Sequence, residues 1–177
     1  MPRGISKTAE SEQMSVYKAA LDGNIDFLRG IDSESLGAAG RNGITPAYLA
    51  AEGGHTACLE LIARECPISL GAADGNGRTS AHRAAEGGYT ACLELIAREC
   101  PRILGVADSN GITPAHRAAE GGYTACLELI NEICPGSLGV VDRYGRTSPS
   151  SVVDSVYAAG AAGAVSAAPI PGGMPGF

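Results

Sequence analysis

Tryptophan is absent from this chain of 177 residues, and the three aromatic residue types together make up only 5% of it. Hydrophobic residues nonetheless reach 45%, so small and aliphatic side chains must build the core. Such side chains suit thin layers that approach each other closely, because a well-packed interior leaves few voids. Net positive charge is also missing: the formal net charge is −6, which argues against non-specific binding to nucleic-acid phosphates.

Long hydrophobic runs are missing as well. The sequence has no stretch of about 18 consecutive apolar residues, which is the length needed to cross a bilayer. Its first residues, "MPRGISKTAESEQMSVYK", lack the apolar segment of a signal peptide. We therefore expect a cytoplasmic protein that does not enter membranes, with delivery into a host cell by an address of another kind as the alternative.

What the chain does contain is an internal repeat. Stretches of nearly identical sequence begin at Asn42, Asn76 and Asn110, and the truncated "YGRTSPSS" begins at Tyr144. The glycine that follows each of these starts recurs every 34 residues, at positions 43, 77, 111 and 145. Self-similarity of this length predicts a solenoid, in which each unit buries its apolar face against its neighbours.

Each unit predicts two short helices. The "DGNG" that begins at Asp74 supplies the residues of a tight turn, and Thr79 then caps a helix. The alanines of this helix, among them Ala84, are spaced to face inward. A glycine pair ends it. A second helix follows and ends before Pro101, because the residue before a proline resists helical geometry.

This succession resembles the ankyrin repeat. "TPAYLAAEGGH" from Thr45 and "TPAHRAAEGGY" from Thr113 match the family motif Thr-Pro-Leu-His-x-Ala-Ala followed by Gly-His. The resemblance implies an all-α solenoid of helix–turn–helix units with short β-turn or hairpin fingers. It also implies that the motif histidines bond to the motif threonines. The motif leucine is alanine throughout, and Tyr48 replaces the histidine of the first unit, so a histidine-mediated link is not expected there.

The repeat also predicts the domain organisation. We expect a flexible segment over 1–12, an ankyrin repeat domain over 13–158 and a disordered tail rich in Gly, Ala and Pro over 159–177. Within the domain we expect an amino-terminal cap, three full repeats and a partial carboxyl-terminal unit. Their ranges are 13–40, then 41–74, 75–108 and 109–142, then 143–158.

The cysteines and histidines are the residues that could carry chemistry. A Cys/His hydrolase needs one thiolate beside one oriented base, whereas Cys92 and His82 recur 34 residues later as Cys126 and His116. A C-x₇-C pair spans about 12 Å along a helix, which is too far for one tetrahedral zinc ion. Stacked helices lie ~8–10 Å apart, and bridged Cα atoms only ~4.4–6.8 Å apart. We expect no metal, no cofactor and six free thiols.

The family resemblance implies that the inner face of the first helices and the turn tips bind a protein. Arg83 and Glu86 are three residues apart and share a helix face, as do their counterparts in the next unit. We expect these pairs to form an exposed, alternating charge ladder that either solvates the protein or faces a partner. The candidate partner-binding residues are Asn42, Ile44, Asn76, Arg78, Arg83, Glu86, Asn110, Ile112, Arg117, Glu120, Arg143 and Tyr144.

The sequence therefore predicts a non-catalytic module for protein–protein interaction, a binder or adaptor that is itself a monomer. One alternative is an effector or regulator that inhibits a single enzyme by occluding its surface. The remote alternative is a Cys/His hydrolase. Neither nucleic acid nor a membrane is an expected partner.

Overall fold

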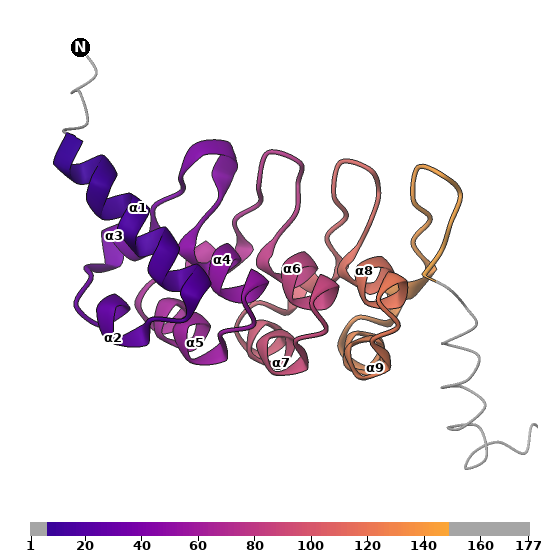
Figure 1. Cartoon of the computed structure of the whole chain (residues 1–177). Helices are drawn as coiled ribbons and strands as arrows, with labels where there is room; N and C mark the ends of the chain where they lie inside the picture. Colours follow the sequence, from indigo (N-terminus) through magenta and orange to yellow (C-terminus); the bar gives the residue numbers. More distant parts are fainter. Residues whose placement is uncertain (1–6, 149–177) are drawn as a thin grey trace, which may run out of the picture.

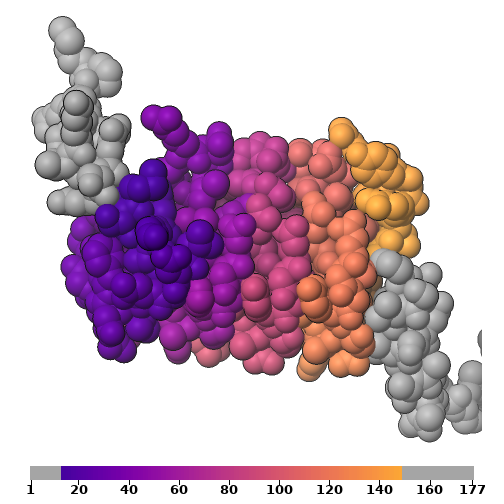
Figure 2. All heavy atoms as spheres, in the orientation of Figure 1, coloured from indigo at the N-terminus to yellow at the C-terminus, as the bar shows by residue number. Residues whose placement is uncertain are grey.

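The computed structural model describes residues 7–148, and their side chains from residue 13 onward. The helical units stand side by side in one row, with the first helices of the repeats in one layer and the second helices in another (Figure 1). In the space-filling view the units follow one another as bands along the long axis (Figure 2). Successive repeats therefore pack in sequence order, as a solenoid requires.

The described helices fall into a cap and three repeats. The cap holds α1 (Lys7–Asp22), α2 (Ile25–Leu28) and α3 (Ser33–Gly37). The first helices of the repeats are α4 (Pro46–Glu52), α6 (Ser80–Glu86) and α8 (Pro114–Glu120). Their second helices are α5 (Thr56–Glu65), α7 (Thr90–Glu99) and α9 (Thr124–Ile133). Short 3-10 helices are η1 (Arg41–Gly43), η2 (Pro67–Gly71), η3 (Pro101–Gly105) and η4 (Pro135–Gly139).

Local sequence sets where the first helices begin and end. The hydroxyl of Thr45 accepts a hydrogen bond from the N–H of Tyr48 at 3.2 Å, which satisfies a donor that the helix itself leaves free. The helix stops at a glycine pair whose second member, Gly54, has φ of +71°. That conformation costs glycine little, and it lets the N–H of His55 reach the carbonyl of Ala50 at 2.8 Å.

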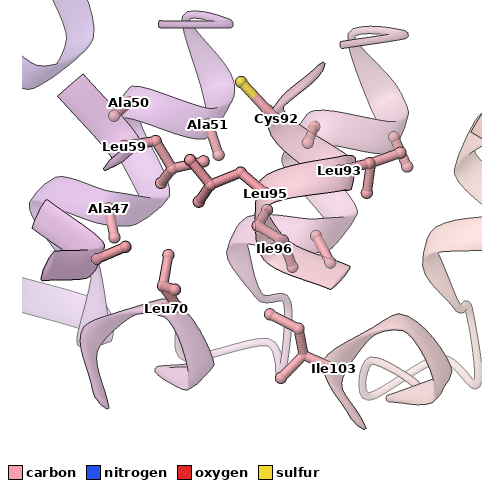
Figure 3. Packing of buried hydrophobic residues seen from close by; sticks show 14 of the residues in the cluster. Ala47, Ala50, Ala51, Leu59, Leu70, Cys92, Leu93, Leu95, Ile96 and Ile103 are labelled. Carbon is pink, nitrogen blue, oxygen red and sulfur yellow. The ribbon is translucent and has the colours of Figure 1, made fainter. Parts of the chain in front are cut away.

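The core is made of small and aliphatic side chains, which confirms the prediction from composition. Ala81, Ala84 and Ala85 of α6 are fully buried, as are Leu93 and Ile96 of α7. Figure 3 shows the same kinds of residue interlocking between consecutive repeats. Because α6 contacts both α4 and α8, alanine on these faces allows the close approach that a wider side chain would prevent.

The loops after the second helices are more ordered than the sequence predicts. Each contains a 3-10 helix that starts at a proline: η2, η3 and η4. Leu70 and Leu104 in two of them are fully buried, and the carbonyl of Leu70 accepts a hydrogen bond from the hydroxyl of Ser80 at 2.8 Å. Each of these segments thus packs against both helices of its own repeat.

At the amino-terminal end the structure differs from the expected domain boundary. At the carboxyl-terminal end the expected boundaries lie outside the described residues. Helix α1 begins at Lys7, inside the segment 1–12 that the sequence predicts to be flexible. The partial unit that starts at 143 is described only through Ser148. Residues 149–158 and the tail 159–177 lie outside the described residues.

Candidate protein-binding surface

The turns between repeats project from the same side of the helical layers and form a row of tips (Figure 1). Each turn is closed by a backbone bond, such as that from the N–H of Asp74 to the carbonyl of Arg78 at 2.8 Å. Residues 7–148 contain no β-strand, so the fingers are hydrogen-bonded turns.

Neighbouring tips are joined by further backbone bonds. The N–H of Gly75 donates to the carbonyl of Asn42 at 2.7 Å, and the N–H of Ser109 donates to the carbonyl of Asn76 at 2.8 Å. The N–H of Arg143 donates in the same way to the carbonyl of Asn110 at 2.9 Å. Because each tip is bonded to the next, the row is held in one arrangement before any partner arrives.

The side chains on the tips are less constrained than the backbone. Asn42, Asn76, Arg143 and Tyr144 are exposed, the last with 67% of its surface accessible. Asn110 is partly exposed, as are Ile44 and Arg78, in keeping with their places along the turns. Among the described residues, the side-chain amides of Asn42, Asn76 and Asn110 make no hydrogen bond to the rest of the protein. These groups are therefore available to hydrogen-bond a ligand.

Ile112 is buried, unlike the other candidate partner-binding residues. Its side chain is only 5% exposed, and its N–H donates to the Asp108 carboxylate at 3.0 Å. The carbonyl of Ile112 also accepts a hydrogen bond from the ring of His82 at 2.9 Å. A side chain this deeply buried offers almost no surface to a partner, so Ile112 is not part of the binding surface.

The motif histidines link consecutive repeats. Nδ1 of His82 accepts from the N–H of Thr79 at 3.1 Å, while Nε2 donates to the carbonyl of Ile112 in the next repeat at 2.9 Å. His116 forms the same pair of bonds with Thr113 and the carbonyl of Arg146. Burial, the largest influence, lowers the pKa of His82 and so favours the neutral ring, which the acceptor role of Nδ1 also requires. The expected bond between histidine and threonine is confirmed.

Tyr48 forms a different link at the same position of the first repeat. Its hydroxyl donates to the Asp74 carboxylate at 2.9 Å and accepts from Nε of Arg83 at 2.7 Å. The Arg83 guanidinium also stacks on the Tyr48 ring at 5.1 Å from the centroid. At this position a network of side chains thus takes the place of the histidine bonds found in the later repeats.

The predicted exposure of the inner-face arginines is wrong. The side chains of Arg83 and Arg117 are only 18% and 19% exposed, whereas Glu86 and Glu120 are 44% and 42% exposed. Arg83 lies 2.7 Å from Glu86, and Arg117 lies 3.0 Å from Glu120. The arginine side chains are less exposed because each extends along the stack and contacts a residue of the preceding repeat. The glutamates are the more exposed members of both pairs and form the outer rim of the ladder, where Arg146 also lies 3.6 Å from Glu120.

Arg117 is less well satisfied than Arg83. The preceding repeat has histidine at the position of Tyr48, so it offers Arg117 no hydroxyl. Nε of Arg117 is buried and has no hydrogen-bond partner among the described residues. A terminal nitrogen lies 3.7 Å from the Asp108 carboxylate. Asp108 has isoleucine four residues on, where Asp74 and Asp142 have arginines bonded at 3.0 and 2.7 Å.

The turn aspartates organise the tips. The carboxylate of Asp74 accepts from the N–H groups of Asn76 and Arg78 at 2.8 and 2.9 Å. Burial alone would raise the pKa of Asp74, but these bonds and the Tyr48 hydroxyl outweigh it and lower that pKa. Asp108 and Asp142 make the same backbone bonds in their own turns. The aspartates therefore set turn shape and are not free to bind a ligand.

The cysteines occupy packing positions. Cys58, Cys92 and Cys126 are buried, and burial raises the pKa of each thiol. Sγ of Cys92 lies 3.3 Å from the hydroxyl of Thr56 in the preceding repeat. A thiol with a raised pKa is a poor nucleophile, and both ring nitrogens of His82 already have other partners. All six cysteines are unbridged in the structure, and their redox state in solution stays a prediction.

Two shallow grooves lie away from the tips. One of about 490 Å³ runs over α2, α5 and α7, and its lining includes Arg29, Glu60 and Arg98. The other, of about 430 Å³, lies beside η2 and is lined by Pro67, Ile68 and neighbouring small residues. Neither contains a motif histidine. Within residues 7–148, no cluster of three or more His, Cys, Asp or Glu side chains is arranged to hold a metal ion.

Membrane-spanning helices are absent from the part of the chain that the structure describes. None of its helices is both long enough and apolar enough to cross a bilayer.

Comparison with known proteins identifies the repeat. The family model described as ankyrin repeats (3 copies) matches residues 16–103, from the cap to η3 of the second full repeat. No curated protein matched the chain. The third repeat, beyond the matched range, has the same helices, the same Thr113–His116 bonds and the same glycine-pair stop. Ankyrin repeats are generally protein–protein interaction modules, and their family is typically non-catalytic. The chain belongs to the ankyrin repeat family.

Proposed function

We propose that this protein recognises a protein partner, without catalysis, through its row of turn tips and the glutamate rim of the inner face. The observation that carries the proposal is the row itself. Backbone bonds join the tips at 2.7 to 2.9 Å, while the side chains of Asn42, Asn76 and Tyr144 are exposed to solvent. A surface that is ordered in advance loses less entropy on binding.

The inner face contributes in a secondary way. Its arginines are engaged with Tyr48, Glu86 and Glu120, so a partner would meet mainly the glutamate carboxylates. In each pair the arginine is 18–19% exposed and the glutamate 42–44% exposed, so a glutamate carboxylate can contact a partner's cation while it keeps its arginine. We therefore assign the largest share of affinity to the tips, where Tyr144 is a residue type that is enriched at interface hot spots.

The hydrolase alternative gains no support from the contacts of the residues it would need. The thiol of Cys92 and the ring of His82 both bond to threonines and to neighbouring repeats. The inhibitor alternative is a narrower form of the same proposal: the partner would be one enzyme, bound tightly enough to block it.

The test is affinity capture with three versions of the protein. A tip variant carries Asn42→Gly, Asn76→Ala and Tyr144→Ala, in which glycine suits the φ of +63° at position 42. A control variant carries Glu60→Ala, Glu94→Ala and Glu128→Ala, three exposed positions on the second helices with the same 34-residue spacing. Circular dichroism establishes that all three proteins are folded.

The wild type and the control should capture the same partner, identified by mass spectrometry, and the tip variant should lose it. Capture of a single enzyme whose activity falls on binding would support the inhibitor form. If the tip variant retains the partner and the control loses it, the outer helices are the binding face and the proposal is wrong.

A further inference from the structure

The junctions between consecutive repeats have the same apolar packing but different polar contacts. Alanines at the same places in α4, α6 and α8 are fully buried, among them Ala50, Ala84 and Ala118. The second helices also repeat their buried residues, as Leu59 and Leu93 show. Because these apolar contacts recur from unit to unit, a difference in strength between two junctions has its origin in their polar groups.

The first and second repeats are joined by a complete network of charged groups. The hydroxyl of Tyr48 donates to the Asp74 carboxylate at 2.9 Å and accepts from Nε of Arg83 at 2.7 Å. The guanidinium of Arg83 also lies over the Tyr48 ring and 4.0 Å from the Glu52 carboxylate. Hydrogen bonds to charged groups are about twice as strong as those between neutral groups, so this junction resists opening.

Between the second and third repeats the same network is not formed. His82 occupies the position of Tyr48, and its ring donates instead to the carbonyl of Ile112, a bond between neutral groups. Arg117 lies 3.7 Å from the Asp108 carboxylate, and its Nε is buried without a hydrogen-bond partner among the described residues. A buried donor that water would satisfy on opening destabilises the closed junction.

The third repeat contains another polar atom of this kind. Asn131 of α9 stands where the earlier second helices have Ala63 and Ala97. Its Oδ1 is buried and has no hydrogen-bond partner in the part of the chain that the structure describes. Alanine needs no such partner, so the repeat beyond the weaker junction is also the less well satisfied one.

We propose that the stack opens first between α6 and α8, so that the third repeat separates and unfolds while the cap and the first two repeats stay folded. A repeat buries its apolar face only against its neighbours, so α8 and α9 lose their structure together. Opening also breaks the bond from the N–H of Ser109 to the carbonyl of Asn76, which divides the row of tips into a fixed part and a movable part. This opening takes place in the free protein and does not depend on a partner.

Hydrogen exchange of the backbone amides, followed by NMR in the full-length protein, measures the opening. Residues 82–96 and 116–130 have the identical sequence HRAAEGGYTACLELI, so their amides share the same intrinsic exchange rates and differ only through structure. We expect the amides of α8 and α9 to exchange at least about fivefold faster than the same amides of α6 and α7. One opening free energy should describe α8 and α9 together.

Two reciprocal variants separate this opening from simple fraying at the end of a stack. His82→Tyr offers a hydroxyl to Asp108 and Arg117, and it should slow exchange in α8 and α9 by about fivefold. Tyr48→His removes the hydroxyl that Arg83 bonds to, and it should raise exchange in α6 and α7 towards that of α8 and α9. Each variant therefore narrows the difference between the two segments, in opposite ways.

Fraying would give protection that rises evenly with distance from the end of the stack and would leave both variants like the wild type. Equal exchange of the two segments in the wild type, or a folded His82→Tyr variant with unchanged exchange in α8 and α9, would overturn the proposal. If His82→Tyr does not fold, Tyr48→His decides, because unchanged exchange in its α6 and α7 would mean that the Tyr48 network does not strengthen its junction.

Discussion

One position of the repeat shows how a single residue changes the way neighbouring units are joined. Position 48 is tyrosine, and positions 82 and 116 are histidine. Histidine joins the next repeat through a backbone carbonyl, whereas tyrosine joins it through Asp74 and Arg83. The resemblance to the ankyrin repeat implies the bond from each histidine to its threonine, but the bond to the carbonyl of the next repeat is known only from the structure. The sequence does not predict the tyrosine network, whose partners lie 26 and 35 residues away.

The difference between the two arginines leads to a stability prediction. Arg83→Ala should lower the free energy of unfolding by about 1–2 kcal/mol. The substitution removes a charged hydrogen bond to Tyr48 and a half-exposed ion pair with Glu86. Arg117→Ala should cost less than half as much, because Nε of Arg117 has no acceptor among the described residues. Urea unfolding measures both, and equal losses would show that the Tyr48 contact contributes nothing.

His82 makes stability depend on pH. Burial lowers its pKa in the folded state below the ordinary value of 6.5. As pH falls below about 6.5, the unfolded chain therefore binds a proton that the folded chain does not. Stability from this site is complete above about 6.5 and decreases below it, by at most about 1.4 kcal/mol per pH unit.

The matched variant is His82→Tyr, which copies the residue of the preceding repeat. Its hydroxyl would face Asp108 and Nε of Arg117 as Tyr48 faces Asp74 and Arg83. Urea unfolding at about pH 7.5 and about pH 5.5 should show a smaller loss for this variant than for the wild type. The same loss in both proteins would mean that His82 is not the group responsible.

At the scale of elements, the sequence predicts the paired helices well and the loops poorly. Thr79, Pro114 and the glycine pairs act within a few residues, so their effects are visible in the sequence alone. The 3-10 helices are not predicted, although leucines at 70, 104 and 138 recur with the 34-residue period after each proline. That recurrence is the signal that the loops contribute to the core.

Element position also predicts how the thiols behave. Cys58, Cys92 and Cys126 lie within second helices and are buried, whereas Cys66, Cys100 and Cys134 lie at their ends and are partly exposed. A chromogenic reagent should find six thiols in denatured, unreduced protein, and in the native protein the second group should react first. Protein handled without oxidation that yields fewer than about five thiols would contradict the reducing location assumed for the chain.

At the scale of the whole molecule, the repeat predicts a row of tips but not which charges face outward. The spacing of Arg83 and Glu86 places them on one helix face, and only the neighbouring repeat decides that the arginine lies beneath the glutamate. The contacts between repeats depend on how neighbouring repeats pack, and the sequence of a single repeat does not show this. Because both arginines are already engaged within the stack, we expect the turn tips to contribute more of the affinity than the arginines.

The most direct measurement is the dissociation constant of the captured, purified partner for the wild type, the tip variant and the outer-helix control, by titration calorimetry. We expect Asn42→Gly, Asn76→Ala and Tyr144→Ala together to weaken binding by about 30-fold or more, which is the size of one hot-spot contact. The control at Glu60, Glu94 and Glu128 should bind within about twofold of the wild type, since exposed residues outside an interface contribute little. Unchanged affinity of a folded tip variant would contradict binding through the turn tips.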